Sequence, residues 1–274
     1  MAGSLVPLVG GVFAWLDDDP RHGAANAGVV VDEDGVTVVD TLMVAEQWEP
    51  FGAAVDAIGR PMKRVVLTSS NVEFAGGTGR FRLGAVYGRP QASAHLDQPA
   101  DPELFRRLHP AFAPSFDDEF ATRPISHVVD APARLTPACT LVPMTGQLEE
   151  NLVVVLEGEG IAFAGAMCSF GVTPNAAQGH PARWAEELDR LVDLAPIVVP
   201  GHGPIGGEEE VRELQAYLRA VVAADGDPAR LAPGPWRDWR GAADWDVVNV
   251  ERAALLAAGR DEPPMTLLTR LGLT

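Results

Sequence analysis

The sequence predicts an α/β fold in which two β-sheets pack face to face with helices on the outside, an αββα sandwich. Two observations support this prediction. Strand signals come in two batches, one in the first third of the chain and one from residue 125 to 164, and helical segments follow each batch. The 274 residues are also enough for one large domain with a substantial core. We therefore expect a single domain over residues 1–274.

The first batch begins with a hairpin. Residues 26–41 hold two β-branched runs on either side of Asp34-Gly35, a strong turn signal between strands. Residues 45–58 have apolar positions at helical spacing, and residues 64–68 are a short buried strand. A glycine-rich loop that leads into the start of a helix is expected at residues 73–81, and another strand is expected at 84–93.

The second batch follows an irregular segment. Residues 97–124 are rich in Pro, Phe and Asp and predict an insertion that is a candidate lid. A C-terminal extension begins at about residue 225. Between them we expect strands at 125–129, 139–143, 152–156, 161–164 and 197–199 and helices at 184–194 and 208–223, with a last helix at 247–258.

Composition narrows the function. The net charge of −17 and the pI near 4.6 make the surface repel phosphate backbones and anionic lipids, so we expect neither nucleic acid nor membrane as a partner. No stretch approaches the roughly 18 apolar residues of a membrane span. The apolar N-terminal run lacks a basic leader and is interpreted as strands. Only Cys139 and Cys168 are present, which favours a cytoplasmic location. The abundance of Arg, Ala, Gly and Pro over Lys is typical of a GC-rich bacterial genome.

Four segments together resemble the metallo-β-lactamase superfamily, and in particular a hydrolase-type branch of it. Their order and spacing match the family's over roughly residues 8–258, which implies the αββα sandwich again. The last segment is close to the family's V-P-G-H-G-P. The segments are Val39-Asp40-Thr41, VVLTSSNVEFAGG (residues 65–77), LVVVLEGEGIAFAGAM (152–167) and VVPGHGP (198–204).

The resemblance implies one or two zinc ions held by His and Asp side chains, but this chain departs from the ligand set. Hydroxyl and amide groups are poor zinc ligands, and Phe binds no metal. We therefore expect no metal and no other cofactor. The family's motif histidines fall on Ser69, Asn71, Phe74 and Gln147, its motif aspartate on Glu73 and its bridging aspartate on Ala166, so that only His202 is unchanged.

Glu73 and His202 are the predicted catalytic residues, because the resemblance places both in one cleft. A carboxylate beside an imidazole makes an acid–base pair that works near neutral pH. The alternative is that His202 is a relic whose ring bonds only to the backbone of its turn.

Six further residues are candidates for substrate binding, each with an ordinary structural alternative. Ser69 and its neighbour Ser70 raise the idea of a serine nucleophile, but the G-x-S-x-G elbow is absent. A cysteine in this position is more often a buried apolar group than a nucleophile, and a histidine at a helix entry often serves the helix. No role is assigned to His22, His95, His109 or His127. The six are Ser69, Asn71, Phe74, Gln147, Cys168 and His180.

These features predict a metal-independent enzyme that acts on a small, partly apolar molecule by acid–base chemistry. The reaction types that fit are cyclisation, isomerisation, elimination and acyl hydrolysis, with bacterial secondary-metabolite biosynthesis as the setting. One alternative is a non-catalytic ligand-binding or partner protein on the scaffold of a former hydrolase. Another is a single-metal hydrolase that recruits Glu149 or Glu150. The oligomeric state is left open.

Overall fold

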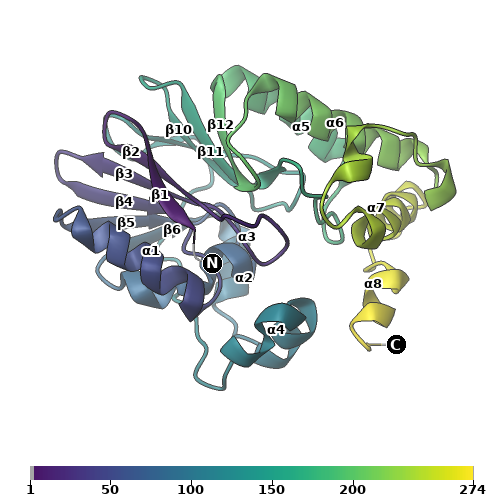
Figure 1. Cartoon of the computed structure of the whole chain (residues 1–274), viewed down its shortest axis with the longest axis horizontal. Helices are drawn as coiled ribbons and strands as arrows, with labels where there is room; N and C mark the ends of the chain where they lie inside the picture. Colours follow the sequence, from purple (N-terminus) through teal and green to yellow (C-terminus); the bar gives the residue numbers. More distant parts are fainter. Residues whose placement is uncertain (1–2, 274) are drawn as a thin grey trace.

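The computed structural model describes residues 3–273. Two sheets face each other with helices on both outer sides, as predicted (Figure 1). The first sheet has the order β1 (Ser4–Val9), β2 (Val12–Leu16), β3 (Ala27–Asp32), β4 (Gly35–Val39), β5 (Met62–Val66), β6 (Ala85–Gly88), β7 (His127–Val128). The second has the order β12 (Ile197–His202), β11 (Ile161–Ser169), β10 (Leu152–Leu156), β9 (Thr140–Pro143), β8 (Ala133–Arg134).

The helices lie on the outer faces of the sheets and around the insertion and the C-terminal extension. Helices α1, α5, α6 and α7 are the long ones. Their bounds are α1 (Ala45–Ala57), α2 (Val72–Ala75), α3 (Pro90–Leu96), α4 (Pro102–Leu108), α5 (Pro181–Leu194), α6 (Glu208–Ala223), α7 (Ala242–Ala257) and α8 (Met265–Arg270), with 3-10 helices η1 (Gly76–Phe81), η2 (Pro110–Ser115), η3 (Pro228–Arg230) and η4 (Pro235–Asp238).

The predicted hairpin is the β3–β4 pair, whose register ends with Asp32 opposite Gly35. From β4 onward the strands of the first sheet run parallel. Helix α1 covers the outer face, where the rings of Phe51 and Trp15 lie 5.3 Å apart. Because parallel strands require crossovers that return to the same edge, the loops that follow β4 and β5 open at one end of the sandwich.

The second sheet is covered by α5 and α6, as Figure 1 shows, and α7 packs against these two helices. The indole of Trp184 on α5 is fully buried and donates a hydrogen bond to the carbonyl of Met167 on β11 at 3.0 Å. Between the two sheets lies a third apolar cluster that includes Val30, Leu141 and Phe163. Residues from both batches of strands therefore share one core.

The structure corrects several local predictions. Residues 73–81 are helix α2 and η1 rather than a loop, and the predicted strand at 84–93 is a short strand followed by α3. Strand β11 extends to Ser169, because its parallel pairing with β12 resumes beyond an irregularity at Gly165. The insertion at 97–124 contains α4 and η2, and a further helix, α8, follows the predicted last one. No helix within residues 3–273 is long and apolar enough to span a membrane.

Candidate active site

Asp40 is hydrogen-bonded to the start of the first site loop, the segment that follows β5. Its backbone adopts a positive φ of 60° directly after β4. The carboxylate accepts hydrogen bonds from the backbone N–H of Thr68 at 2.8 Å and from its hydroxyl at 2.7 Å. Burial raises the pKa of Asp40 to about 7. This buried bridge sets the direction in which the chain leaves β5 toward Ser69 and Glu73.

Two glycines bring the loop against the backbone that follows β4. A Cβ atom at Gly76 would lie 2.1 Å from the carbonyl oxygen of Met43, and one at Gly77 would lie 2.1 Å from that of Thr41. Only glycine permits so close an approach. The backbone of Thr41 also donates to the carbonyl of Phe74 at 2.7 Å. These contacts fix α2, which carries Glu73.

The second site loop is the turn at the end of β12. Asn26, at the start of β3, is buried and its side-chain amide donates to the carbonyls of Pro200 at 3.0 Å and Gly203 at 2.8 Å. Its backbone N–H donates to Gly201 at 2.7 Å. The turn that carries His202 is thus tied to the opposite sheet.

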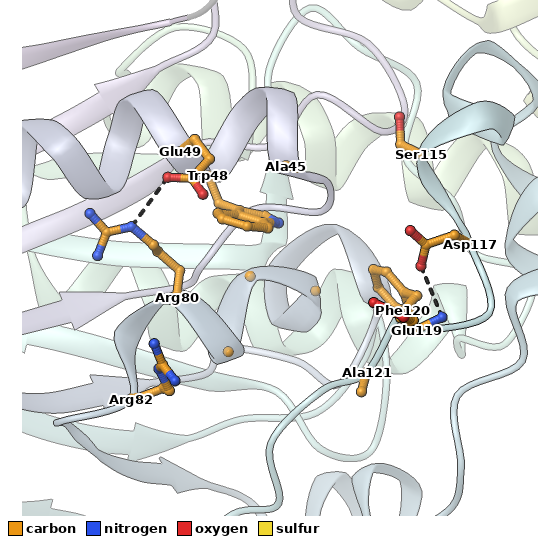
Figure 2. A pocket seen from close by; sticks show the side chains of 13 residues that line it. Ala45, Trp48, Glu49, Arg80, Arg82, Ser115, Asp117, Glu119, Phe120 and Ala121 are labelled. Carbon is orange, nitrogen blue, oxygen red and sulfur yellow. Dashed lines mark hydrogen bonds and ion pairs between the residues drawn. The ribbon is translucent and has the colours of Figure 1, made fainter.

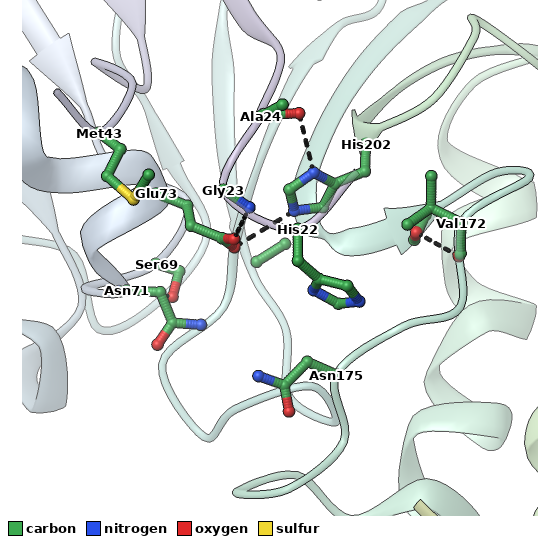
Figure 3. A network of polar contacts seen from close by, with 12 residues as sticks. His22, Gly23, Ala24, Met43, Ser69, Asn71, Glu73, Val172, Asn175 and His202 are labelled. Atoms are coloured by element: carbon green, nitrogen blue, oxygen red, sulfur yellow. Dashed lines mark hydrogen bonds and ion pairs between the residues drawn. The ribbon is translucent and has the colours of Figure 1, made fainter. Parts of the chain in front are cut away.

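Glu73 and His202 meet at this end of the sandwich, as expected. Glu73 Oε2 lies 3.3 Å from His202 Nε2, and the side chains are 11% and 9% exposed. The other ring nitrogen, Nδ1, lies 3.1 Å from the carbonyl of Ala24. Because a carbonyl and a carboxylate only accept hydrogen bonds, this arrangement fits an imidazolium that donates from both nitrogens (Figure 3).

Electrostatics agree with an ion pair. Burial works against a charge on either group. Burial alone would raise the pKa of Glu73, but the neighbouring His202, with smaller contributions from His109 and His22, holds it well below its usual value. Likewise burial opposes the charge on His202, but Glu73 outweighs it and raises the pKa of the imidazole.

Two histidines that the sequence analysis left without a role also belong to this site. His109 Nδ1, from the insertion, lies 3.8 Å from Glu73 Oε1. That oxygen also accepts from the backbone N–H of Gly23. The ring of His22 lies 5.9 Å from the ring of His202. Both histidines lie in irregular segments, where no periodic pattern marks them in the sequence. The only signal was that His22 stands in a Gly- and Ala-rich segment just before β3.

A small cavity of about 30 Å³ lies beside these groups. This volume holds one or two water molecules, whereas pockets for drug-sized ligands usually measure about 300–1,000 Å³. An organic substrate therefore requires the site to open. The lining residues are His22, Asn71, Glu73, Phe74, Gln147, Ala166, Ser169, Pro174, Asn175, Trp184 and His202.

A larger cavity of about 600 Å³ lies elsewhere, between α1, η1 and the residues after η2 (Figure 2). Its lining includes Trp48, Arg80 and Phe120 but neither Glu73 nor His202. Arg80 is already paired with Glu49 at 3.5 Å and with Asp56. The larger cavity is therefore not part of the site.

Searches with this sequence match no family model and no curated protein, but the structure resembles several solved ones. The DIM-1 metallo-β-lactamase superimposes with a TM-score of 0.63 at 16% identity, over 80% of this chain and 98% of that one. FIM-1 from Pseudomonas aeruginosa, in its mono-zinc form, gives 0.63 at 18% over 80% and 96%. A metallo-β-lactamase from Erythrobacter litoralis gives 0.62 at 20% over 79% and 96%.

The chain has the metallo-β-lactamase fold. This fold implies zinc, and the residues at the site do not fit it. Asn71, Phe74, Gln147 and Ala166 line the cavity where the resemblance places metal ligands. Within residues 3–273 no group of three or more His, Cys, Asp or Glu side chains has the geometry to hold a metal ion.

On this metallo-β-lactamase fold, the predicted substrate-binding residues divide into two groups. Asn71, Phe74 and Gln147 line the cavity. Ser69 is fully buried beneath it, and its hydroxyl accepts a hydrogen bond from the N–H of Asn71 at 3.1 Å. A buried hydroxyl of this kind shapes the loop. The contribution of each residue to substrate binding stays a prediction.

The other two predicted substrate-binding residues, Cys168 and His180, lie away from the cavity, which corrects their expected place in the site. Cys168 points into the core beneath α5 and α6, where burial raises the pKa of its thiol far above the usual value. Regular alternation would place Cys168 on the same side as Ala166, which lines the cavity, but the pairing of β11 with β12 is irregular between Gly165 and Ser169, and Cys168 packs in the core. His180 caps α5, and its Nδ1 accepts from the N–H of Arg183 at 3.3 Å.

The structure also shows where the residues of two alternatives lie, namely the serine nucleophile and the single-metal site that recruits Glu149 or Glu150. The hydroxyl of Ser70 lies 3.1 Å from His95 Nδ1, and Glu150 Oε2 lies 2.9 Å from the same nitrogen. One nitrogen cannot accept a proton from the serine while donating one to the carboxylate, so this trio is no nucleophilic triad. Glu149 pairs with Arg183 at the surface. Neither Glu149 nor Glu150 lines the cavity.

Proposed function

We propose that this protein is an enzyme that performs metal-independent acid–base chemistry with Glu73 and His202. The observation that carries the proposal is their contact at 3.3 Å, largely buried and bordering a cavity with both polar and apolar lining residues. Paired groups whose charges depend on each other commonly exchange protons with a substrate near neutral pH. Structural ion pairs are also found in cores, so the cavity beside this pair is what favours catalysis.

The reaction types that fit are cyclisation, isomerisation, elimination and acyl hydrolysis. Among these, acyl hydrolysis has the most support. The similar structures include β-lactamases by name, and a cavity of about 30 Å³ suits a water molecule next to His202. In such a reaction His202 donates a proton to the oxygen that gains charge, and Glu73 keeps the imidazolium charged and oriented.

The substrate class follows from the lining and the surface. Asn71, Gln147 and Asn175 offer amide groups, while Phe74 and Trp184 are apolar. The net charge of −17 repels anions. We infer a small neutral or cationic, partly apolar carbonyl compound, in bacterial secondary-metabolite biosynthesis. The proposal includes a cytoplasmic location and neither nucleic acid nor membrane as a partner.

The test compares Glu73→Gln and His202→Asn with His95→Gln, which alters the exposed His–Glu contact. With 4-nitrophenyl acetate and butyrate as probes, the first two variants should lower kcat/KM by about 10²–10⁴-fold and the third by less than about twofold. Circular dichroism checks the fold of each variant. Dialysis against a chelator should leave the wild-type rate unchanged, and elemental analysis should find no stoichiometric zinc or iron.

A non-catalytic ligand-binding or partner protein is the second candidate, and Asn71, Phe74 and Gln147 at positions where the resemblance places metal ligands favour it. Folded Glu73→Gln and His202→Asn variants with the wild-type rate would refute the acid–base proposal and leave this alternative. About one metal per chain, with activity lost to the chelator, would refute metal independence.

A further inference from the structure

One nitrogen of His22 is committed to the backbone. Nε2 lies 2.8 Å from the carbonyl oxygen of Thr173. A carbonyl only accepts, so Nε2 carries the hydrogen. The ring also packs against the indole of Trp245 with centroids 4.5 Å apart, which limits its rotation. These two contacts hold the His22 ring in one orientation and so fix the direction in which its Nδ1 points.

The second nitrogen is free. Within residues 3–273, Nδ1 of His22 has no hydrogen-bond partner, and the ring lines the cavity. Figure 3 shows the ring of His22 next to His202, with one nitrogen on the side of Asn71 and Asn175. If the ring is neutral, Nδ1 carries a lone pair that faces a space of the size of a water molecule.

The surroundings keep His22 neutral. The ionisable groups that face it are Glu73, His202 and His109. Burial lowers the pKa of His22 to about 4, although Glu73 alone would raise it, and the charge of His202 lowers it further. The pKa values of the two neighbouring imidazoles thus shift in opposite directions, since Glu73 raises the pKa of His202. Environments that separate the pKa values of two neighbours mark a base and an acid.

We propose that His22 Nδ1 is the general base of the site and that His202 Nε2–H is the general acid. The proposal rests on the proposed function and specifies it as hydrolysis of a neutral carboxylic ester or lactone. The contact of 3.3 Å between His202 and Glu73 is long for a charge-assisted hydrogen bond. The proton on Nε2 is therefore available to a substrate oxygen that enters between them.

The step balances without any further reactant. His22 Nδ1 removes one proton from water while the water oxygen bonds to the acyl carbon, and the carbonyl π electrons move to the carbonyl oxygen, to which His202 Nε2–H donates. When the C=O bond re-forms, the proton on the carbonyl oxygen returns to His202 Nε2 and the bond from the acyl carbon to the alkoxy oxygen breaks. The proton on His22 then passes to that oxygen, and both histidines return to their starting states.

The first experiment needs no substrate. ¹⁵N NMR of the six histidines at pH 7 should show a neutral His22 protonated on Nε2 and a His202 protonated on both nitrogens. Single His→Gln variants assign them to His22 and His202. The His22 signal should stay neutral down to a pH near 4. A His22 ring that is charged at pH 7, or protonated on Nδ1, would overturn the proposal.

The second experiment measures hydrolysis of 4-nitrophenyl acetate. His22→Gln should lower kcat by about 10²–10⁴-fold, and free imidazole should partly restore the rate in His22→Gly but not in His202→Asn. His127→Gln, which alters an exposed ring stacked on Tyr87, serves as the control and should keep the wild-type rate. Loss of activity in Glu73→Gln and His202→Asn, with His22→Gln fully active, would overturn His22 as the base and leave the proposed function standing. Full activity in all three would overturn both.

Discussion

Two histidine–glutamate contacts lie on the 69–74 loop and its surroundings, and they differ in environment more than in length. His95 Nδ1 lies 2.9 Å from Glu150, with the His95 side chain 65% exposed. His202 Nε2 lies 3.3 Å from Glu73, with both side chains about one-tenth exposed. The shorter contact joins an exposed imidazole to the Glu150 side chain, which is 1% exposed, whereas the longer one joins two buried groups beside the cavity.

The comparison teaches that solvent access, and not separation, decides what such a contact does. Water surrounds the His95 ring, and contacts with such access to solvent contribute roughly 0–1 kcal/mol. At the buried pair each charge relies on the other, so removing one partner leaves the other uncompensated. His109 and His22 add to this dependence, because they face the same carboxylate. The buried contact is therefore the one suited to proton transfer.

The largest expected effect on stability comes from Glu73→Ala. It should lower the free energy of unfolding by about 3–5 kcal/mol, because it strands a charged His202. Glu73→Gln keeps the size and one acceptor and should cost less. The lowered pKa of Glu73 stabilises the folded state fully above the usual pKa of Glu, and the raised pKa of His202 does so fully below the usual pKa of His. The loss of unfolding free energy in Glu73→Ala should therefore be largest between about pH 4.5 and 6.5. It should shrink as His202 loses its proton at higher pH. Urea unfolding at several pH values measures it; a deficit below about 1 kcal/mol throughout would contradict the ion pair.

A smaller effect is expected when the loop that holds Glu73 is displaced. Gly76→Ala puts a methyl group 2.1 Å from the carbonyl oxygen of Met43 and should cost about 1–3 kcal/mol through local strain. Gly79→Ala, in the same 3-10 helix, meets no atom within 4 Å and is the matched control. Thermal unfolding of both variants tests this. Equal melting temperatures would show that the loop is not fixed by this contact.

Asp40 should make stability fall as the pH rises. Its pKa of about 7 in the folded state exceeds the unfolded value, so between about pH 4 and 7 the native state binds more protons. Its contribution to unfolding free energy should therefore drop by up to about 1.4 kcal/mol per pH unit in this range. Asp40→Asn retains an acceptor for Thr68 and should reduce that slope. An unchanged slope in chemical unfolding would show that Asp40 is ionised in the folded protein.

The smallest effect is expected from His95→Ala. Because the His95 side chain is mostly exposed, we expect a loss of about 0–1 kcal/mol, and less still in high salt. Ser70 would keep its backbone hydrogen bond to Glu150, at 2.6 Å. Urea unfolding of this variant beside Glu73→Ala gives the two contacts on one scale. Equal losses would abolish the distinction drawn from exposure.

The sequence by itself determined the fold and the position of two site residues. The hairpin around Asp34-Gly35 depends on local backbone conformation, which a few neighbouring residues specify. The resemblance then aligned Glu73 and His202 with inward-facing positions of a known sandwich, and the structure places them in contact.

Only the tertiary structure decided the rest of the site. His22 precedes β3 and His109 follows α4, and no periodicity marks either residue, because long-range packing of irregular loops brings them to Glu73. Cys168 also lies in the core, because the irregular pairing of β11 with β12 between Gly165 and Ser169 breaks the alternation that the sequence alone would suggest. Short stretches of sequence determine residue types and local conformation. Which loops meet, and how much water they exclude, depends on the whole core.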